Sequence, residues 1–157
     1  SNAWKRARGW EATTELILDY AAEINASAIL LDEREVWHAL DFYAGGTRAQ
    51  PILAWRRNAY VKSFSEFEPL TDALDDNVLV ASYRSGFRPR MRADFETFEK
   101  IGEFSIPLGF RSNGCEITRR FVLYRASGYA PLVRDAAWED RFRNEREDEN
   151  PHCPARD

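Results

Sequence analysis

Three short apolar runs constrain the fold of this 157-residue chain more than any other feature of its sequence. They are Ser27–Leu31, Pro51–Trp55 and Asn77–Tyr83. Continuous apolar runs of this length are typical of strands that are buried on both faces, as in a parallel sheet. The intervals between the runs are long enough for crossover connections. We therefore expect three parallel strands.

Helical patterns lie on both sides of the first run. Between Trp10 and Asn25, apolar residues recur at the spacing of one helix face: Leu16, Ile17, Tyr20, Ala21 and Ile24. After the run, Asp32 and Glu35 resemble a capping box, in which Asp32 begins a helix. The apolar stripe of that second helix ends at Gly45.

Beyond Tyr83 the pattern changes to one that is typical of antiparallel strands. Phe104, Ile106 and Leu108 alternate with polar or small residues, and Ile117–Tyr124 is rich in β-branched and aromatic residues. Asn113–Gly114 lies between them and is a strong hairpin signal. The sequence thus predicts an α/β fold: a small mixed sheet, with parallel strands and flanking helices in a Rossmann-like, three-layer arrangement, plus a C-terminal antiparallel hairpin.

The chain divides into one domain and two short ends. Residues 1–3, Ser-Asn-Ala, have the composition of the scar left by a cleaved expression tag, so we expect the chain to be part of a longer protein. Residues 4–133 are predicted to form a single α/β domain. Residues 134–157 are predicted to hold a charged helix over Ala136–Glu147, with Glu139 paired to Arg143, and a frayed tail.

Composition excludes several classes of protein. The chain has 22 basic and 26 acidic residues, a net charge of -4, which disfavours a nucleic-acid partner. Cys115 and Cys153 are either free thiols or one long-range disulfide. The only histidines are His38 and His152, so we expect no metal site, and the chain has no phosphate-binding glycine loop or other cofactor motif.

The best candidate site follows the first strand. Asp32 and Arg34 lie where open α/β sheets place their ligand-binding residues, at the carboxyl end of a strand. The alternative is that Asp32 only caps the following helix. We expect no catalytic residue among these groups, because paired carboxylates alone do not define a hydrolytic site.

A second candidate is a group of arginines after the third strand. Arg84, Arg88 and Arg90, followed by Arg92, are predicted to lie on a loop that contacts a phosphate or an anionic lipid head group. The alternative is a solvated loop whose charge is balanced by the acidic residues that follow: Asp94, Glu96 and Glu99.

The five tryptophans are scattered over different predicted elements. Core packing accounts for Trp37 and Trp55. Trp4 and Trp10 lie on either side of basic residues, a composition that is typical of a membrane-proximal segment.

Three segments resemble the soluble C-terminal region of bacterial glycosyltransferase family 39 proteins, which are protein mannosyltransferase-like membrane enzymes. They are Ala28–Glu35 leading into Leu40–Ala44, Phe67–Thr71 followed by Asn77–Val80, and Ile101–Gly109 followed by Phe121–Tyr129. The resemblance covers most of the chain, from about Trp10 to Leu132. Each motif is a pattern of strands and turns, and none is a catalytic signature.

The resemblance implies a non-catalytic domain on the periplasmic face of the bacterial inner membrane. The catalytic module of such proteins is a polytopic membrane region that uses a polyprenyl-phosphate sugar donor. The implied partners are that N-terminal transmembrane module, the membrane surface, and a glycan or lipid-linked acceptor. A different class remains open, namely a free-standing small-molecule-binding domain that uses the strand ends near Asp32 and Tyr83.

Overall fold

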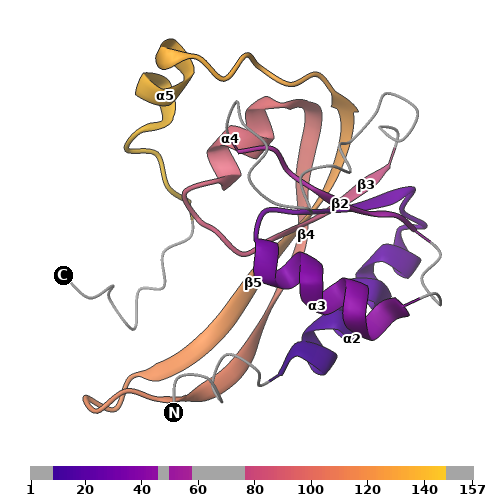
Figure 1. The fold of residues 1–157 in the computed structure, drawn as a ribbon, viewed down its shortest axis with the longest axis vertical. Helices are drawn as coiled ribbons and strands as arrows, with labels where there is room; N and C mark the ends of the chain where they lie inside the picture. The colour runs from indigo at the N-terminus through magenta and orange to yellow at the C-terminus, as the bar shows by residue number, and fades with distance from the viewer. Residues whose placement is uncertain (1–8, 46–49, 58–76, 148–157) are drawn as a thin grey trace.

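The chain folds around one five-stranded mixed sheet, in the strand order β2-β1-β3-β5-β4 (Figure 1). The computed structural model describes residues 9–45, 50–57 and 77–147. The strands are β1 (Ala28–Leu31), β2 (Ile52–Ala54), β3 (Val78–Ser82), β4 (Phe95–Phe110) and β5 (Glu116–Tyr129). The helices are α2 (Trp10–Glu23), α3 (Arg34–Ala44), α4 (Arg88–Ala93) and α5 (Ala136–Phe142). The predicted α/β class is confirmed, as a mixed sheet with helices.

The three apolar runs form the parallel half of the sheet, as their sequences predict. β1 pairs in parallel with β2 on one side and with β3 on the other, so that Leu30 lies beside both Leu53 and Val80. Every residue of β1 and β3 is buried. These strands lack the alternation of polar and apolar residues because both of their faces are covered.

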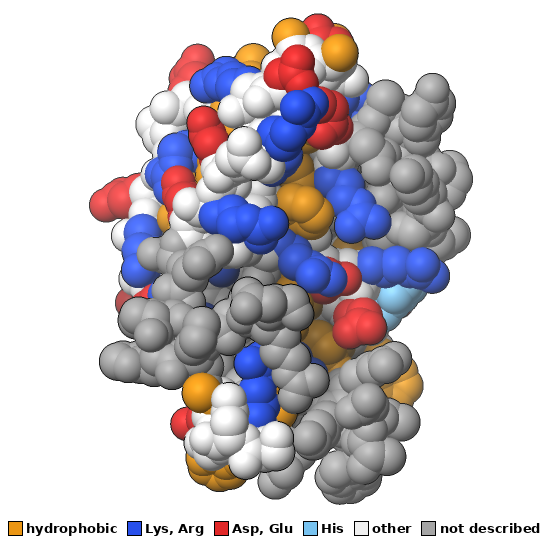
Figure 2. Space-filling model, turned by 90° about the vertical axis from the view of Figure 1, so that its left-hand side faces the viewer, with side chains coloured by type: hydrophobic (Ala, Val, Ile, Leu, Met, Phe, Trp, Pro, Cys, Tyr) orange, Lys and Arg blue, Asp and Glu red, His pale blue; other side chains and the backbone are white. Residues whose placement is uncertain are grey.

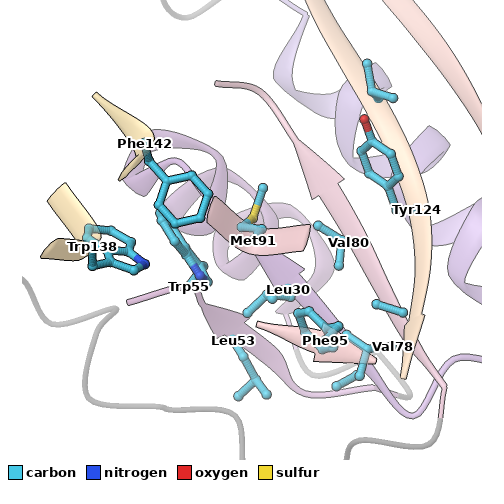
Figure 3. Packing of buried hydrophobic residues seen from close by; sticks show 13 residues of the cluster. Leu30, Leu53, Trp55, Val78, Val80, Met91, Phe95, Tyr124, Trp138 and Phe142 are labelled. Atoms are coloured by element: carbon cyan, nitrogen blue, oxygen red, sulfur yellow. The ribbon is translucent and has the colours of Figure 1, made fainter. Parts of the chain in front are cut away.

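Each face of the sheet has its own hydrophobic cluster. The cluster on one face includes Ile29 and Leu31 of β1 and packs against α2 and α3. The cluster on the other face includes Leu30 and packs against Met91 of α4 and against Trp138 and Phe142 of α5 (Figure 3). Neighbouring residues of one strand therefore stabilise opposite faces of the sheet.

The other half of the sheet is a long antiparallel hairpin made by β4 and β5. β5 pairs with β3, and the far end of the hairpin extends well beyond the parallel strands (Figure 1). The predicted turn is confirmed in place and corrected in form. Residues 111–115 join the strands, and of Asn113 and Gly114 only Gly114 has a positive φ, of 83°. The side chain of Asn113 instead accepts a hydrogen bond from the Cys115 N–H, at 3.0 Å.

Two helices differ from the prediction. α4 occupies part of the predicted arginine loop, and Pro89 lies in its first turn, where proline is favoured. α5 ends at Phe142 and not at Glu147, because residues 143–147 contain no apolar side chain that could continue its buried stripe. The predicted pair of Glu139 with Arg143 is wrong, since Arg143 pairs with Asp140.

The structure also bears on the predictions for the tryptophans, the cysteines and the chain ends. Trp37 and Trp55 are both buried in the core, as predicted. Cys115 is disulfide-bonded, and the second cysteine of the chain, Cys153, lies outside the described residues. Trp4, the segment Phe67–Thr71 and the predicted frayed tail also lie outside them. Within the described part of the chain, no helix is long and apolar enough to cross a membrane.

Candidate functional site

The carboxyl ends of β1 and β3 form the candidate site. Asp32 follows β1, and Ser82 ends β3. β1 lies between its two parallel partners, so the chain moves from β1 to β2 on one side and returns to β3 on the other. In open α/β sheets, ligands bind at the carboxyl ends of strands where the strand order reverses in this way. The structure thus places Asp32 and Ser82 at the position where this fold class forms its binding sites.

Asp32 is buried, and both of its carboxylate oxygens accept hydrogen bonds. Oδ2 accepts from the Ser82 hydroxyl at 2.7 Å and from the Arg84 N–H at 3.1 Å, and Oδ1 accepts from the Tyr83 N–H at 2.8 Å. The carboxylate therefore joins the end of β1 to the end of β3. The predicted capping role is wrong, because Glu33 is the N-cap of α3 and no side chain caps that helix end.

Arg88 extends this network toward the C-terminal segment. Its Nε donates to the Ser82 hydroxyl oxygen at 2.9 Å, and its Nη2 lies 3.4 Å from the Ser82 carbonyl oxygen. Its Nη1 donates to the Glu147 carbonyl oxygen at 3.2 Å. Arg88 is buried, with only 2% of its surface exposed. Arg88, one of the predicted loop arginines, is therefore a buried structural residue that links the end of β3 to Glu147.

Burial raises the pKa of the Asp32 carboxyl group above its ordinary value. The hydrogen bonds from Tyr83, Ser82 and Arg84 and the positive charge of Arg88 act in the opposite direction. Burial has the largest influence, and among the described residues no cation forms an ion pair with this carboxylate. Asp32 consequently takes up a proton more readily than an exposed aspartate does.

Charged side chains also lie near the buried network. Arg84 forms an ion pair with Glu33, and its guanidinium lies 5.5 Å from the centre of the Tyr83 ring. Arg34 is exposed, and its Nε lies 3.4 Å from His38 Nε2. The structure therefore brings Asp32, Arg84 and Arg88 together, with Arg34 on the neighbouring helix.

Arg90, the last predicted site residue, faces a different element. Its Nη1 donates to the Gly86 carbonyl oxygen at 2.6 Å. Its guanidinium lies 5.4 Å from the Trp138 ring and 5.7 Å from the Phe142 ring. Arg90 thus covers the aromatic side chains of α5 and does not contact the Asp32 network.

A second carboxylate, Asp94, is expected from the sequence to be solvated and to balance the nearby arginine loop, but in the structure it is buried and pairs with Arg134. Its two oxygens accept hydrogen bonds from Arg134 Nη1 at 2.8 Å and Nη2 at 2.6 Å. Trp55 Nε1 donates to the same carboxylate at 2.9 Å, and the Leu132 N–H donates at 3.0 Å. The sequence carries no local signal for this arrangement, because Trp55 and Arg134 lie 39 and 40 residues from Asp94 along the chain.

Both carboxylates are thus fully engaged in holding segments of the chain together. In the part of the chain that the structure describes, no group of three or more histidine, cysteine, aspartate or glutamate side chains is arranged to bind a metal ion. The surface instead offers charged side chains, which attract charged partners. Figure 2 views the side on which α4 and α5 lie, and it shows lysine and arginine side chains crossing the middle of this face, with acidic side chains among them.

Comparisons with known proteins give no relative from which a site can be transferred. No protein-family model matches the chain, no curated protein matches it, and no solved structure matches its fold.

Proposed function

We propose that this chain is a non-catalytic extracytoplasmic domain of a membrane glycosyltransferase of the protein mannosyltransferase-like class. The observation that carries the proposal is the engagement of Asp32, the carboxylate best placed for chemistry. Its oxygens hold Ser82, Tyr83 and Arg84 and thereby join two strands. A domain of this kind acts through its surface, by recognising the acceptor or by docking on the transmembrane module of the same protein.

The disulfide of Cys115 supports a location on the periplasmic face of the inner membrane. Disulfides persist in oxidising compartments, which include the bacterial periplasm, and they are rare in the cytosol. Mass measurement of the chain purified without reductant should show no free thiol. Two free thiols in protein taken from intact cells under thiol-blocking conditions would contradict the proposed location.

We also propose that the sheet and its helices form a Rossmann-like, three-layer arrangement. The unit β1-α3-β2 is a parallel crossover, and hydrophobic clusters lie on both faces of the sheet. These features support a reduced Rossmann-like, three-layer arrangement, in which a long hairpin replaces the second half of the parallel sheet.

The activity of the isolated chain and the gene that encodes it provide two tests. Incubation with a polyprenyl-phosphate sugar and candidate acceptors should give no product, because the proposal assigns donor binding and catalysis to the membrane module. Translation of the gene upstream of Trp4 should show several apolar stretches of roughly 20 residues, the length that spans a bilayer. Turnover by the isolated chain, or an upstream sequence without apolar stretches, would overturn the proposal.

A second candidate function is the binding of a small molecule at the strand ends near Asp32 and Tyr83. The observation that favours it is the reversal of strand order between β1 and β3, which places these residues at the usual ligand position of the fold class. An upstream sequence without apolar stretches, together with a small molecule whose binding is lost in Arg84→Gln, would favour this function over the first.

A further inference from the structure

Three arginines from separate segments converge on the turn that leads from β3 into α4. The Arg57 guanidinium carbon lies 5.8 Å from the centre of the Phe87 ring. Arg90 Nη1 donates to the Gly86 carbonyl oxygen at 2.6 Å. Arg146 Nη1 lies 3.8 Å from the point where a Cβ atom on Gly86 would be. Arg57 follows β2, Arg90 belongs to α4, and Arg146 follows α5, so the fold brings three positive charges to two consecutive residues.

These three arginines differ from their neighbours in having no carboxylate partner among the residues that the structure describes. Arg84 pairs with Glu33, Arg92 pairs with Glu147 and Arg134 pairs with Asp94. Like charges that gather without a counter-ion repel one another and create a positive potential that attracts anions. An external anion that binds at this turn would therefore be attracted by the arginines and would stabilise them.

Contacts with the fold hold the central arginine, Arg90, in a fixed position. Its bond to the Gly86 carbonyl oxygen fixes one end of the guanidinium, and the rings of Trp138 and Phe142 support its plane. A guanidinium that is already ordered loses less entropy when it binds a ligand. Gly86, whose carbonyl oxygen Arg90 binds, has no side chain, and Arg146 lies next to the position that a side chain would occupy.

We propose that the turn at Gly86–Phe87 binds a phosphate group, and that Arg57, Arg90 and Arg146 supply the donors. The planar fork of an arginine matches the oxygens of a phosphate, and several such forks neutralise its two negative charges. The phosphate belongs either to a soluble phosphorylated compound or to a lipid head group, which present the same chemistry. This site does not depend on the proposed function, and it excludes Arg84 and Arg88, which are held by Glu33 and by Ser82.

The test uses the full 157-residue chain and inorganic pyrophosphate at low salt, with binding followed by calorimetry. Arg57→Gln, Arg90→Gln and Arg146→Gln should each weaken binding by about tenfold, the usual loss for one charge-assisted hydrogen bond. The matched control is Arg143→Gln, which removes the same charge from an arginine of the exposed pair with Asp140. Its binding should stay within about twofold of the unchanged chain, because exposed charges away from a site are screened by salt.

Two further measurements complete the test. Arg57 and Arg146 are exposed, so their variants report on binding even if Arg90→Gln lowers the melting temperature. Co-sedimentation with phosphatidic acid vesicles, against phosphatidylcholine vesicles, separates the two sources of phosphate. Binding to these vesicles that depends on the three arginines assigns the site to a lipid head group, and pyrophosphate binding alone assigns it to a soluble ligand. The proposal is overturned if neither ligand binds, or if Arg143→Gln weakens binding as much as the site variants do.

Discussion

The two buried aspartates, Asp32 and Asp94, are neutralised in different ways. Asp94 accepts two parallel hydrogen bonds from the guanidinium of Arg134, in addition to those from Trp55 and Leu132. Asp32 accepts from one hydroxyl and two backbone N–H groups, and the guanidinium of Arg88 reaches it only through Ser82. Among the residues that the structure describes, Asp94 thus contacts a full counter-charge, whereas Asp32 contacts a hydroxyl and two backbone N–H groups.

This difference indicates what each carboxylate contributes. The Asp94–Arg134 pair links the start of β4 to the segment that leads into α5, and breaking a buried pair leaves an uncompensated charge. Asp32 links the ends of β1 and β3, and because its partners are neutral its charge is less well compensated. The first contact is therefore expected to matter most for stability, and the second to depend on pH.

The largest expected effect comes from removing the counter-charge of Asp94. Arg134→Ala should lower the free energy of unfolding by about 3–5 kcal/mol, because it leaves the Asp94 carboxylate buried without its cation. Urea denaturation measures the change. Arg143→Ala, which breaks an exposed pair, is the matched control and should cost at most about 1 kcal/mol. If Arg134→Ala and Arg143→Ala lowered the free energy of unfolding equally, the buried counter-charge of Asp94 would have no special importance for stability.

Deleting the Asp32 carboxylate should have a smaller effect, since no counter-charge is left behind in contact. Asp32→Ala should lower the free energy of unfolding by about 2–3 kcal/mol, because one hydroxyl and two N–H groups lose their buried acceptor. The same denaturation experiment applies, with Asp19→Ala on the exposed face of α2 as the control. A loss that exceeds that of Arg134→Ala would reverse the ranking on which the comparison rests.

The contribution of Asp32 to stability should also depend on pH, which is a smaller effect. The pKa of Asp32 is raised in the folded protein, so the folded state binds its proton more tightly than the unfolded state. The stability that this proton contributes is fully present below the unfolded pKa of Asp32 and is lost as pH rises through its folded pKa. The cost of Asp32→Asn should therefore be greater at pH 4 than at pH 7.

Denaturation of the wild-type chain and of Asp32→Asn across this range gives the comparison. Repeating it in a Glu33→Gln background removes the acidic partner of Arg84 beside the site. If the cost of Asp32→Asn did not change with pH, the pKa of Asp32 would be the same in the folded and unfolded states, which would contradict this prediction.

The sequence predicts the parts of the fold that depend on local pattern. The parallel strands were identified because their apolar residues are consecutive, and the hairpin because Asn113–Gly114 lies between two strand-like segments. The apolar pattern does not predict α4, because half of its sequence, Arg-Pro-Arg-Met-Arg-Ala, is arginine and only Met91 and Pro89 supply a buried apolar face. A helix this short is stabilised by its tertiary contacts, which a local pattern does not contain.

At the candidate site, the sequence likewise predicts the position of Asp32 but not its hydrogen-bond partners. Strand order and chain position predict that Asp32 lies at a carboxyl edge of the sheet, and it does. Its bonds to Ser82 and Tyr83 join residues 50 and 51 positions apart, so no local sequence pattern predicts them. The helix cap that the local pattern suggested was wrong because these distant donors surround the carboxylate.

Asp32 joins the ends of β1 and β3, and we propose that it performs no chemistry. The most direct measurement is sugar transfer by the membrane glycosyltransferase to which we propose this domain belongs, carrying Asp32→Asn, a variant of nearly the same shape. Assayed at a temperature where the variant remains folded, and corrected for the amount of protein, kcat should stay within about twofold of the wild type, whereas loss of a general acid or base typically costs about 10²–10⁴-fold. A folded Asp32→Asn protein whose kcat falls by that larger factor would contradict the claim.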